Sequence, residues 1–533
     1  MKKRAELILF ILGLAIILLA GLNSSQFFTR LDLTANKAFS ISPVSKKLFR
    51  EIPEQVYLTY FVSDKLRKLY SFPGQIEDLL LEYAAYSRGK IRVEVVDPMR
   101  GEEAERAQSL GVAAQQIEVV ERDQRSLAQV YTGIVIQYLD RHQTIPVAVR
   151  VESLEYELTS RIRKAVSGEE LVVGILLGDP GRNLRQEFTN MYRAFSDDFR
   201  IEEVPAGQDV PADVDVLLVI GNQDLKEFDL FPVDQFLMKG GRALFAVKGV
   251  RVDMMRGFLA TKIGDNPTLD LLEAYGVRVK RELVLDKYCQ NFRLPTQVLG
   301  QIMWQVMEKY PYWITVSGQY VAKDNPITAR FNGLDLYWAS PLEIVAKGNT
   351  RAEVLASTTP EGWTANQEPF DTYPRGGPLL LAQPHENKGS YPLAVSLRGE
   401  LASYFKGKAI PTREGEKRDW KSIVEQTKDA RIIVVGDADF ASDLLQFTEA
   451  SYNMDFLANA VQWLGNSEDL LSIKTRTARD TRLNRIQDPA QRLRAVLSTE
   501  LITLVLVPLG VIGFGIGRLV YRRKKSFIRA EEE

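Results

Sequence analysis

Residues 171–177 read LVVGILL and are closed at once by GDPG at 178–181. Six apolar residues around one glycine, ended by turn residues, are typical of a strand that is buried on both faces. VDVLLVI at 214–220 and RIIVV at 431–435 have the same form. Shorter strand patterns at 200–204 and 242–247 and helical patterns at 188–195, 232–239 and 453–464 surround these runs. This alternation predicts a parallel sheet with helices on both faces, which is an α/β fold.

Residues between about 250 and 430 interrupt the alternation. They are rich in proline, glycine and aromatic residues, as in YPYW at 310–313. The sheet pattern resumes only at 431–435. We therefore expect a domain over 169–470 that carries a long insertion at about 250–430.

Another α/β pattern precedes this domain, over 30–168. Ser42 and Pro43 form a helix-start signal, and apolar residues alternate with charged ones at 91–95. The order of predicted helices and strands is close to a thioredoxin-like arrangement. A redox thioredoxin carries C-x-x-C after its first strand, whereas the chain's one cysteine is Cys289. We expect a thioredoxin-like scaffold without disulfide chemistry.

Both ends of the chain carry an apolar run. LILFILGLAIILLAGL at 7–22 and LITLVLVPLGVIGFGIG at 501–517 predict transmembrane helices over 7–23 and 500–520. A cleaved signal peptide is the alternative for the first run, although it lacks a good cleavage site. Basic clusters at 2–4 and 522–525 lie outside both runs. The positive-inside rule then places the segments 1–6 and 521–533 in the cytoplasm and exports everything between the spans.

The membrane-proximal residues allow two interpretations each. The basic segment 471–499 contacts anionic lipid headgroups, or it is a solvated helix. Gly513 and Gly517 allow a second helix to pack closely, or their spacing is a chance occurrence in a glycine-rich span. Neither apolar run contains an ionisable residue, so a transport path would have to come from other subunits.

Composition excludes several classes of function. The 533 residues have a net charge of −1, which gives no support for nucleic-acid binding. One cysteine and two histidines exclude an internal disulfide and a Cys/His-rich zinc site. The chain has no P-loop and no dinucleotide-binding glycine motif. We therefore expect no cofactor and no metal.

Polar residues at the strand ends are the one candidate site. Asp179, Asn222, Asp437 and Asp439 each follow a predicted strand of the second domain, and ligands of open α/β sheets bind at that edge. The other interpretation is that turns require these residue types. A paired acid and base across a crevice would favour an enzyme. Carboxylates satisfied by main-chain amides would remove that support.

Several stretches together resemble the gliding-motility-type ABC transporter auxiliary proteins (GldG-like). They are RLDLTANKAFSISPVSKKLF at 30–49, DLLLEYAAYSRGKIRVEVVDP at 78–98, LTSRIRKAV at 158–166, VVGDADFASD at 434–443 and MDFLANAVQWLGNSEDLLSIKTR at 454–476. They occur in the family's order between two anchors, and the resemblance is weakest over 250–430. It implies that the second domain is flavodoxin-like or amidotransferase-like and lacks the amidotransferase nucleophile.

The resemblance also implies a non-enzymatic subunit of the bacterial inner membrane. Its partners would be an ABC permease, a separate ATPase, membrane lipid and an envelope or cargo protein. The alternative is an exported hydrolase or binding enzyme that acts on carbohydrate or peptidoglycan through Asp437 and Asp439.

Overall fold

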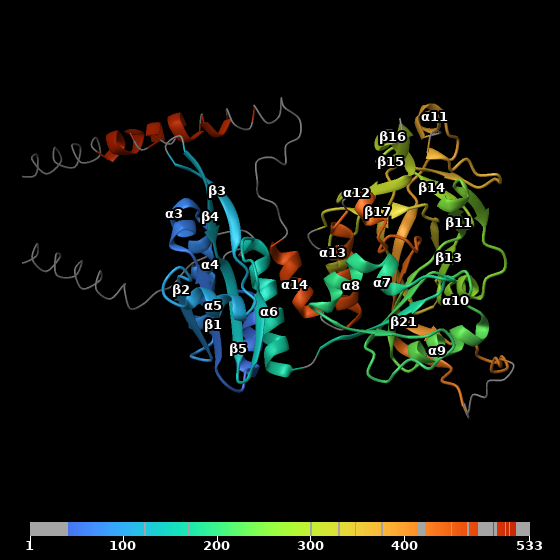
Figure 1. Ribbon diagram of the computed structural model, residues 1–533, viewed down its shortest axis with the longest axis horizontal. Coiled ribbons are helices and arrows are strands. Elements are labelled where there is room, and N and C mark those ends of the chain that lie inside the picture. The colour runs from blue at the N-terminus through green and yellow to red at the C-terminus, as the bar shows by residue number, and fades with distance from the viewer. Residues whose placement is uncertain are drawn as a thin grey trace, which may run out of the picture. The chain divides into compact units, whose positions relative to one another are not determined.

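The computed structural model describes residues 41–121, 124–168, 170–298, 301–328, 331–346, 348–374, 377–413, 422–448, 450–465, 468–477, 494, 498–500, 502–506, 508–510 and 512–518. The first apolar run at 7–22, the basic residues 478–493 and the C-terminal residues 519–533 lie outside this set. The fold is mixed α/β and contains several separate sheets (Figure 1).

A seven-stranded sheet organises the second α/β region, in the order β19-β21-β22-β10-β9-β7-β8. Its parallel strands are β7 (Val172–Leu177), β8 (Arg200–Glu203), β9 (Val216–Ile220), β10 (Arg242–Ala246) and β22 (Gln426–Val435). The apolar runs predicted as buried strands are therefore confirmed as neighbouring parallel strands. β21 (Pro392–Ala402) and β19 (Arg351–Ser357) extend the sheet in the antiparallel direction.

Helices cover both faces of this sheet, as the alternation predicts. Leu218 faces a core formed with α8 (Thr189–Ser196) and α13 (Tyr452–Leu464). The adjacent Leu217 faces the opposite core, which contains α9 (Glu227–Met238) and α10 (Pro267–Tyr275). Successive residues of one strand thus serve two separate cores, because strand side chains alternate. The short helix α7 (Leu184–Glu187) precedes α8.

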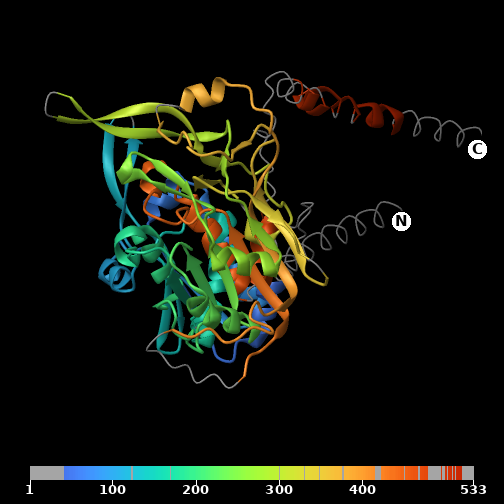
Figure 2. The same cartoon turned by 90° about the vertical axis from the view of Figure 1, so that its right-hand side faces the viewer.

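The expected insertion differs from the prediction because two of its segments, β19 and β21, belong to the main sheet. Its other strands form small sheets. They pair β11 (Val250–Asp253) with β12 (Leu259–Lys262), β13 (Val277–Val279) with β18 (Leu342–Ile344), β14 (Leu283–Leu285) with β20 (Trp363–Ala365), and β15 (Cys289–Val298) with β16 (Gln301–Val316) and β17 (Leu334–Tyr337). Its helices are η1 (Met254–Arg256), η2 (Pro326–Thr328) and α11 (Gly377–Ala382), and α12 (Leu445–Thr448) follows β22. Figure 2 shows β15 and β16 as a long two-stranded arm.

The first α/β region has a four-stranded sheet in the order β2-β1-β5-β6. β1 (Val56–Val62) and β2 (Ile91–Val96) run parallel, whereas β5 (Thr132–Tyr138) and β6 (Arg141–Ile145) are antiparallel to their neighbours. Its helices are α2 (Pro43–Glu51), α3 (Asp64–Leu69), α4 (Phe72–Tyr86), α5 (Glu103–Ser109) and α6 (Val151–Ser167). A separate hairpin pairs β3 (Gln115–Glu121) with β4 (Gln124–Val130).

The helix start at Ser42 is confirmed. The main-chain N–H of Ser45 donates to Ser42 Oγ at 3.1 Å, and Pro43 is the first helical residue. The carboxylate of Glu155 on α6 accepts from Ser42 N at 2.6 Å and from Ser45 Oγ at 2.9 Å. These buried hydrogen bonds fasten α2 to the helix that closes the domain.

The helix α14 (Glu468–Thr477) packs against α6 and continues the folded region to Thr477. Residues from 478 onward form a separate unit. Its one candidate spanning helix among the described residues is Ser498–Arg518, with a mean hydropathy of 2.0. Residues Ile502–Leu506 of this helix (η5) are π-helical.

Candidate functional site

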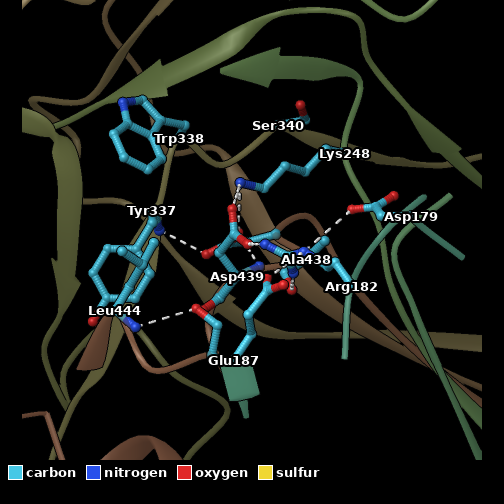
Figure 3. A network of polar contacts seen from close by, with 12 residues as sticks. Asp179, Arg182, Glu187, Lys248, Tyr337, Trp338, Ser340, Ala438, Asp439 and Leu444 are labelled. Atoms are coloured by element: carbon cyan, nitrogen blue, oxygen red, sulfur yellow. Dashed lines mark hydrogen bonds and ion pairs between the residues drawn. The ribbon is translucent and has the colours of Figure 1, made fainter. Parts of the chain in front are cut away.

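The turns that follow β7, β9, β10 and β22 meet at the carboxyl edge of the main sheet. Glycine makes two of these turns possible. Gly221 has φ +88°, and an added Cβ there would lie 2.5 Å from the carboxyl group of Asp179. At Gly436 an added Cβ would lie 2.1 Å from the carbonyl oxygen of Ser340. The chain therefore packs main chain and carboxylates closely at this edge, where Figure 3 shows a continuous polar network.

Asp437 lies at the centre of the network and is fully buried. Its Oδ2 accepts from Tyr337 N at 2.6 Å, and its Oδ1 accepts from Asp439 N at 2.8 Å. The ammonium group of Lys248 lies 3.3 Å from Oδ1. Burial and the charge of Asp439 outweigh Lys248 and these amides, and raise the pKa of Asp437 to about 6.

Asp439 bridges two cations. One carboxylate oxygen accepts from the Lys248 ammonium and the other from the Arg182 guanidinium. Burial alone would raise the pKa of Asp439, but these two charges outweigh burial and hold it well below its usual range. Desolvation would likewise lower the pKa of Lys248, yet Asp439 and Asp437 raise it above its ordinary value. These contacts therefore stabilise the ionised forms of Asp439, Lys248 and Arg182.

Arg182 extends the network to the first strand of the sheet. Its Nε lies 3.9 Å from Asp179 and 3.4 Å from Glu187. Asp179 Oδ1 also accepts from the main-chain N–H groups of Asn222 and Gln223, both at 3.0 Å. The acidic group at the end of β7 thus holds the turn that follows β9.

Asn222 serves the neighbouring turn. Its amide donates to Lys248 O and its carbonyl oxygen accepts from Lys248 N, both at 3.0 Å. The same amide lies 3.4 Å from Asn266 Oδ1. With 1% of its surface exposed, Asn222 has its side chain fully engaged in fixing Lys248.

The structure brings the four predicted residues Asp179, Asn222, Asp437 and Asp439 to one edge, but their polar groups face other protein groups. The insertion supplies the cover. Trp338 lies over Lys248, with 5.5 Å between the ring centroid and Nζ, and Ser340 Oγ accepts from Gly249 N at 2.9 Å.

Sequence reasoning missed Lys248 and Arg182, the two cations of the network. Lys248 directly follows the predicted strand at 242–247, and Arg182 follows the turn GDPG that closes the predicted strand at 171–177. That position beside predicted acidic strand ends was the available signal.

The arrangement can neutralise charge and hold turns together. Asp437 and Asp439 have divergent pKa values, as acid–base pairs do, but the two residues are 0% and 9% exposed. Across the residues that the structure describes, no three His, Cys, Asp or Glu side chains are grouped to hold a metal ion.

Comparisons with known proteins found a relative that matches almost the whole chain and solved structures that match about half of it. A protein of Borreliella burgdorferi described as uncharacterized is 25% identical over 98% of this chain and 100% of its own length. Among solved structures, a ThuA-like protein from Bacteroides uniformis is 12% identical, covering 55% of this chain and 91% of its own, with a TM-score of 0.28. A β-galactosidase from Halorubrum lacusprofundi is 14% identical, covering 53% and 31%, with a TM-score of 0.23. Such low scores carry no argument about function.

Two family models match the chain. A domain of unknown function (DUF7088) matches residues 35–137. The ABC transporter auxiliary model, described as an ABC-type uncharacterized transport system, matches residues 170–460 and so covers the seven-stranded sheet with its insertion. Because this second match spans more than half of the chain, the protein belongs to the ABC transporter auxiliary family.

Proposed function

We propose that the protein is a non-enzymatic, membrane-anchored auxiliary subunit of an ABC transporter, of the gliding-motility type. Its exported domains bind cargo or an envelope partner, and its membrane helices dock to a permease that works with a separate ATPase. The observation that carries this proposal is the family match over residues 170–460. The candidate spanning helix Ser498–Arg518 supports the anchoring.

The proposed topology has two spans, 7–23 and 500–520, in a bacterial inner membrane, with both termini in the cytoplasm. The basic clusters at 2–4 and 522–525 support this orientation. Gly513 and Gly517 are candidates for the permease contact, because their small-xxx-small spacing would let a second helix approach closely. Of the basic segment 471–499, residues 471–477 belong to α14, and the residues after it would lie near lipid headgroups.

The exported part consists of two scaffolds. Residues 30–168 form a thioredoxin-like domain without C-x-x-C, supported by the strand order β2-β1-β5-β6 and by Ser63 and Asp64 after the first strand. Residues 169–470 form a flavodoxin-like or amidotransferase-like domain, with an insertion at about 250–430. Its parallel strands β8, β7, β9, β10 and β22 support this assignment.

The non-enzymatic assignment rests on the polar network. Both carboxylate oxygens of Asp437 accept hydrogen bonds from main-chain N–H groups. Both carboxylate oxygens of Asp439 accept hydrogen bonds from the cations Arg182 and Lys248. An exported hydrolase using these carboxylates would need them free to meet substrate. The alternative therefore has less support than a binding and coupling role.

Affinity purification from native membranes tests the proposal. The full chain, tagged at its C-terminus and extracted in a mild detergent, should recover a permease and an ATPase in stoichiometric amounts. Purification of the chain alone would contradict the proposal. If an Asp439→Asn variant that still folds also recovers both partners, association with the transporter does not depend on the carboxylate that a hydrolase would use.

A further inference from the structure

The distal half of the hairpin β15–β16 is a two-stranded ribbon. The register joins the two strands over six residue pairs, from Arg293 with Val306 to Val298 with Gln301. β17 pairs with β16 only from Trp313 to Val316. Within the sheets of the described chain, no third strand accompanies the ribbon towards its tip.

Beyond Arg293, the sequence of this ribbon contains no charged residue. Residues 294–307 read LPTQVLGQIMWQVM, without Asp, Glu, Lys or Arg. The chain's average of 26% charged residues would place about three or four in a stretch of this length. A ribbon that extends into water normally carries charged residues, which also protect its open edges from pairing with another strand.

Apolar residues occupy both sets of alternating positions along β16. Ile302, Trp304 and Val306 share one set, and Met303 and Met307 share the other. An antiparallel sheet with one solvated face shows apolar residues in only one of the two sets. Gln301 and Gln305 interrupt the second set, so both sets are uncharged over this stretch and at least half apolar, which suits an apolar environment on both sides.

We propose that this ribbon inserts tip-first into the interfacial layer of the bilayer that anchors the chain. Lipid surrounds a ribbon on both faces, whereas a groove on a protein covers one. Tryptophan, as at position 304, is enriched at the membrane interface. At headgroup depth the open strand edges keep water as a hydrogen-bond partner, which the hydrocarbon core would not offer.

Neighbouring residues fit this placement. Arg293, Glu308 and Lys309 lie at the base of the ribbon, so the charged residues of the hairpin begin where its uncharged stretch ends. α11 packs beside β16, and its Leu379 is 62% exposed. The inference rests on the membrane anchoring in the proposed function, but not on the permease or the cargo.

Depth-dependent quenching in lipid vesicles tests this inference on the full chain. Cys289→Ser removes the only cysteine, and Ile302→Cys then carries an environment-sensitive NBD probe. Asp209→Cys, at an exposed position of the same domain, is the aqueous control, and Leu504→Cys in the candidate span is the lipid control. Vesicles contain phosphatidylcholine and phosphatidylglycerol, with bromine on the acyl chains near the headgroup or near the chain end.

The probe at 302 should be quenched at least threefold more than the probe at 209, and more by shallow than by deep bromine. Trp304→Glu should abolish at least half of this quenching, whereas Trp304→Phe should preserve it. Quenching at 504 with none at 302 would overturn the ribbon inference and leave the anchoring intact. Quenching at neither position would refute both. Burial at 302 only after a permease is added would assign the ribbon to a protein partner and also overturn the inference.

Discussion

Lys248→Met is the sharpest test of the network at the carboxyl edge of the sheet. The substitution keeps most of the side-chain volume and removes the ammonium group. It leaves Asp437 buried without a side-chain cation and Asp439 with Arg182 alone. Removing one partner of a buried ion pair costs about 3–5 kcal/mol. We expect a loss of that size in the free energy of unfolding at pH 7.

The loss should depend on pH, because Asp437 can take up a proton. Its pKa is already raised to about 6, and losing Lys248 raises that pKa further. Near pH 5 the carboxyl is neutral in the folded state, so the missing cation matters less. The destabilisation should therefore shrink by roughly half between pH 7 and pH 5. The double variant Lys248→Met/Asp437→Asn should regain a similar share, roughly half, of the lost free energy of unfolding at pH 7.

Tryptophan fluorescence during denaturation by urea measures these changes in the detergent-solubilised chain. All six tryptophans lie between residues 304 and 463, so the signal reports the second domain. Arg200→Met is the matched control. Its ion pair with Asp213 is more than half exposed on each side, and exposed pairs contribute about 0–1 kcal/mol. Equal losses in Lys248→Met and Arg200→Met, or a loss that does not vary with pH, would refute the reasoning.

Three further changes address other contacts. The pKa of Asp437 is higher in the folded state than the unfolded value of about 3.9, so the free energy of unfolding should fall as pH rises from about 4 to 6. Asp437→Asn should flatten this pH dependence of the urea midpoint, and an unchanged slope would contradict the assignment. Gly221 and Gly407 both have positive φ, but an added Cβ meets a carboxyl group only at Gly221. Gly221→Ala should therefore lower the free energy of unfolding by about 1–3 kcal/mol more than Gly407→Ala, and equal shifts in melting temperature would contradict this reasoning. Glu155→Ala should speed amide hydrogen exchange in α2 about tenfold or more, with Glu157→Ala on the same helix as the control.

The buried strands of the second domain could be predicted because each is a short, nearly continuous apolar run closed by turn residues. LVVGILL and VDVLLVI contain too few polar residues to face water on either side, so only a doubly covered sheet suits them. β19 and β21 could not be found in the same way. Both are antiparallel, have irregular register and carry charged residues, and only the pairing of β19 with β21 and of β21 with β22 identifies them as members of the sheet.

The sequence predicts where the candidate site lies, but not that its polar groups are buried and paired with one another. Strand-end acids indicate where the edge of the sheet lies, since carboxyl ends of parallel strands meet. The sequence places Lys248 directly after a predicted strand, which indicates its position at this edge but not its burial. Its burial depends on Trp338, which is 90 residues away, and on Asp437, which is 189 residues away. Contacts at that separation leave no local pattern in the sequence.

The same contacts limit what the carboxyl edge can do. In an open α/β sheet this edge ordinarily receives a ligand. Here residues 337–340 cross it: Tyr337 N donates to Asp437, and Ser340 N donates to Gly436 O at 2.7 Å. The polar groups that would hold a ligand instead hold the insertion. Chemistry at Asp437 or Asp439 would require this segment to leave and two cations to lose their partners. A protein built this way uses the carboxyl edge of its sheet to fix its insertion in place.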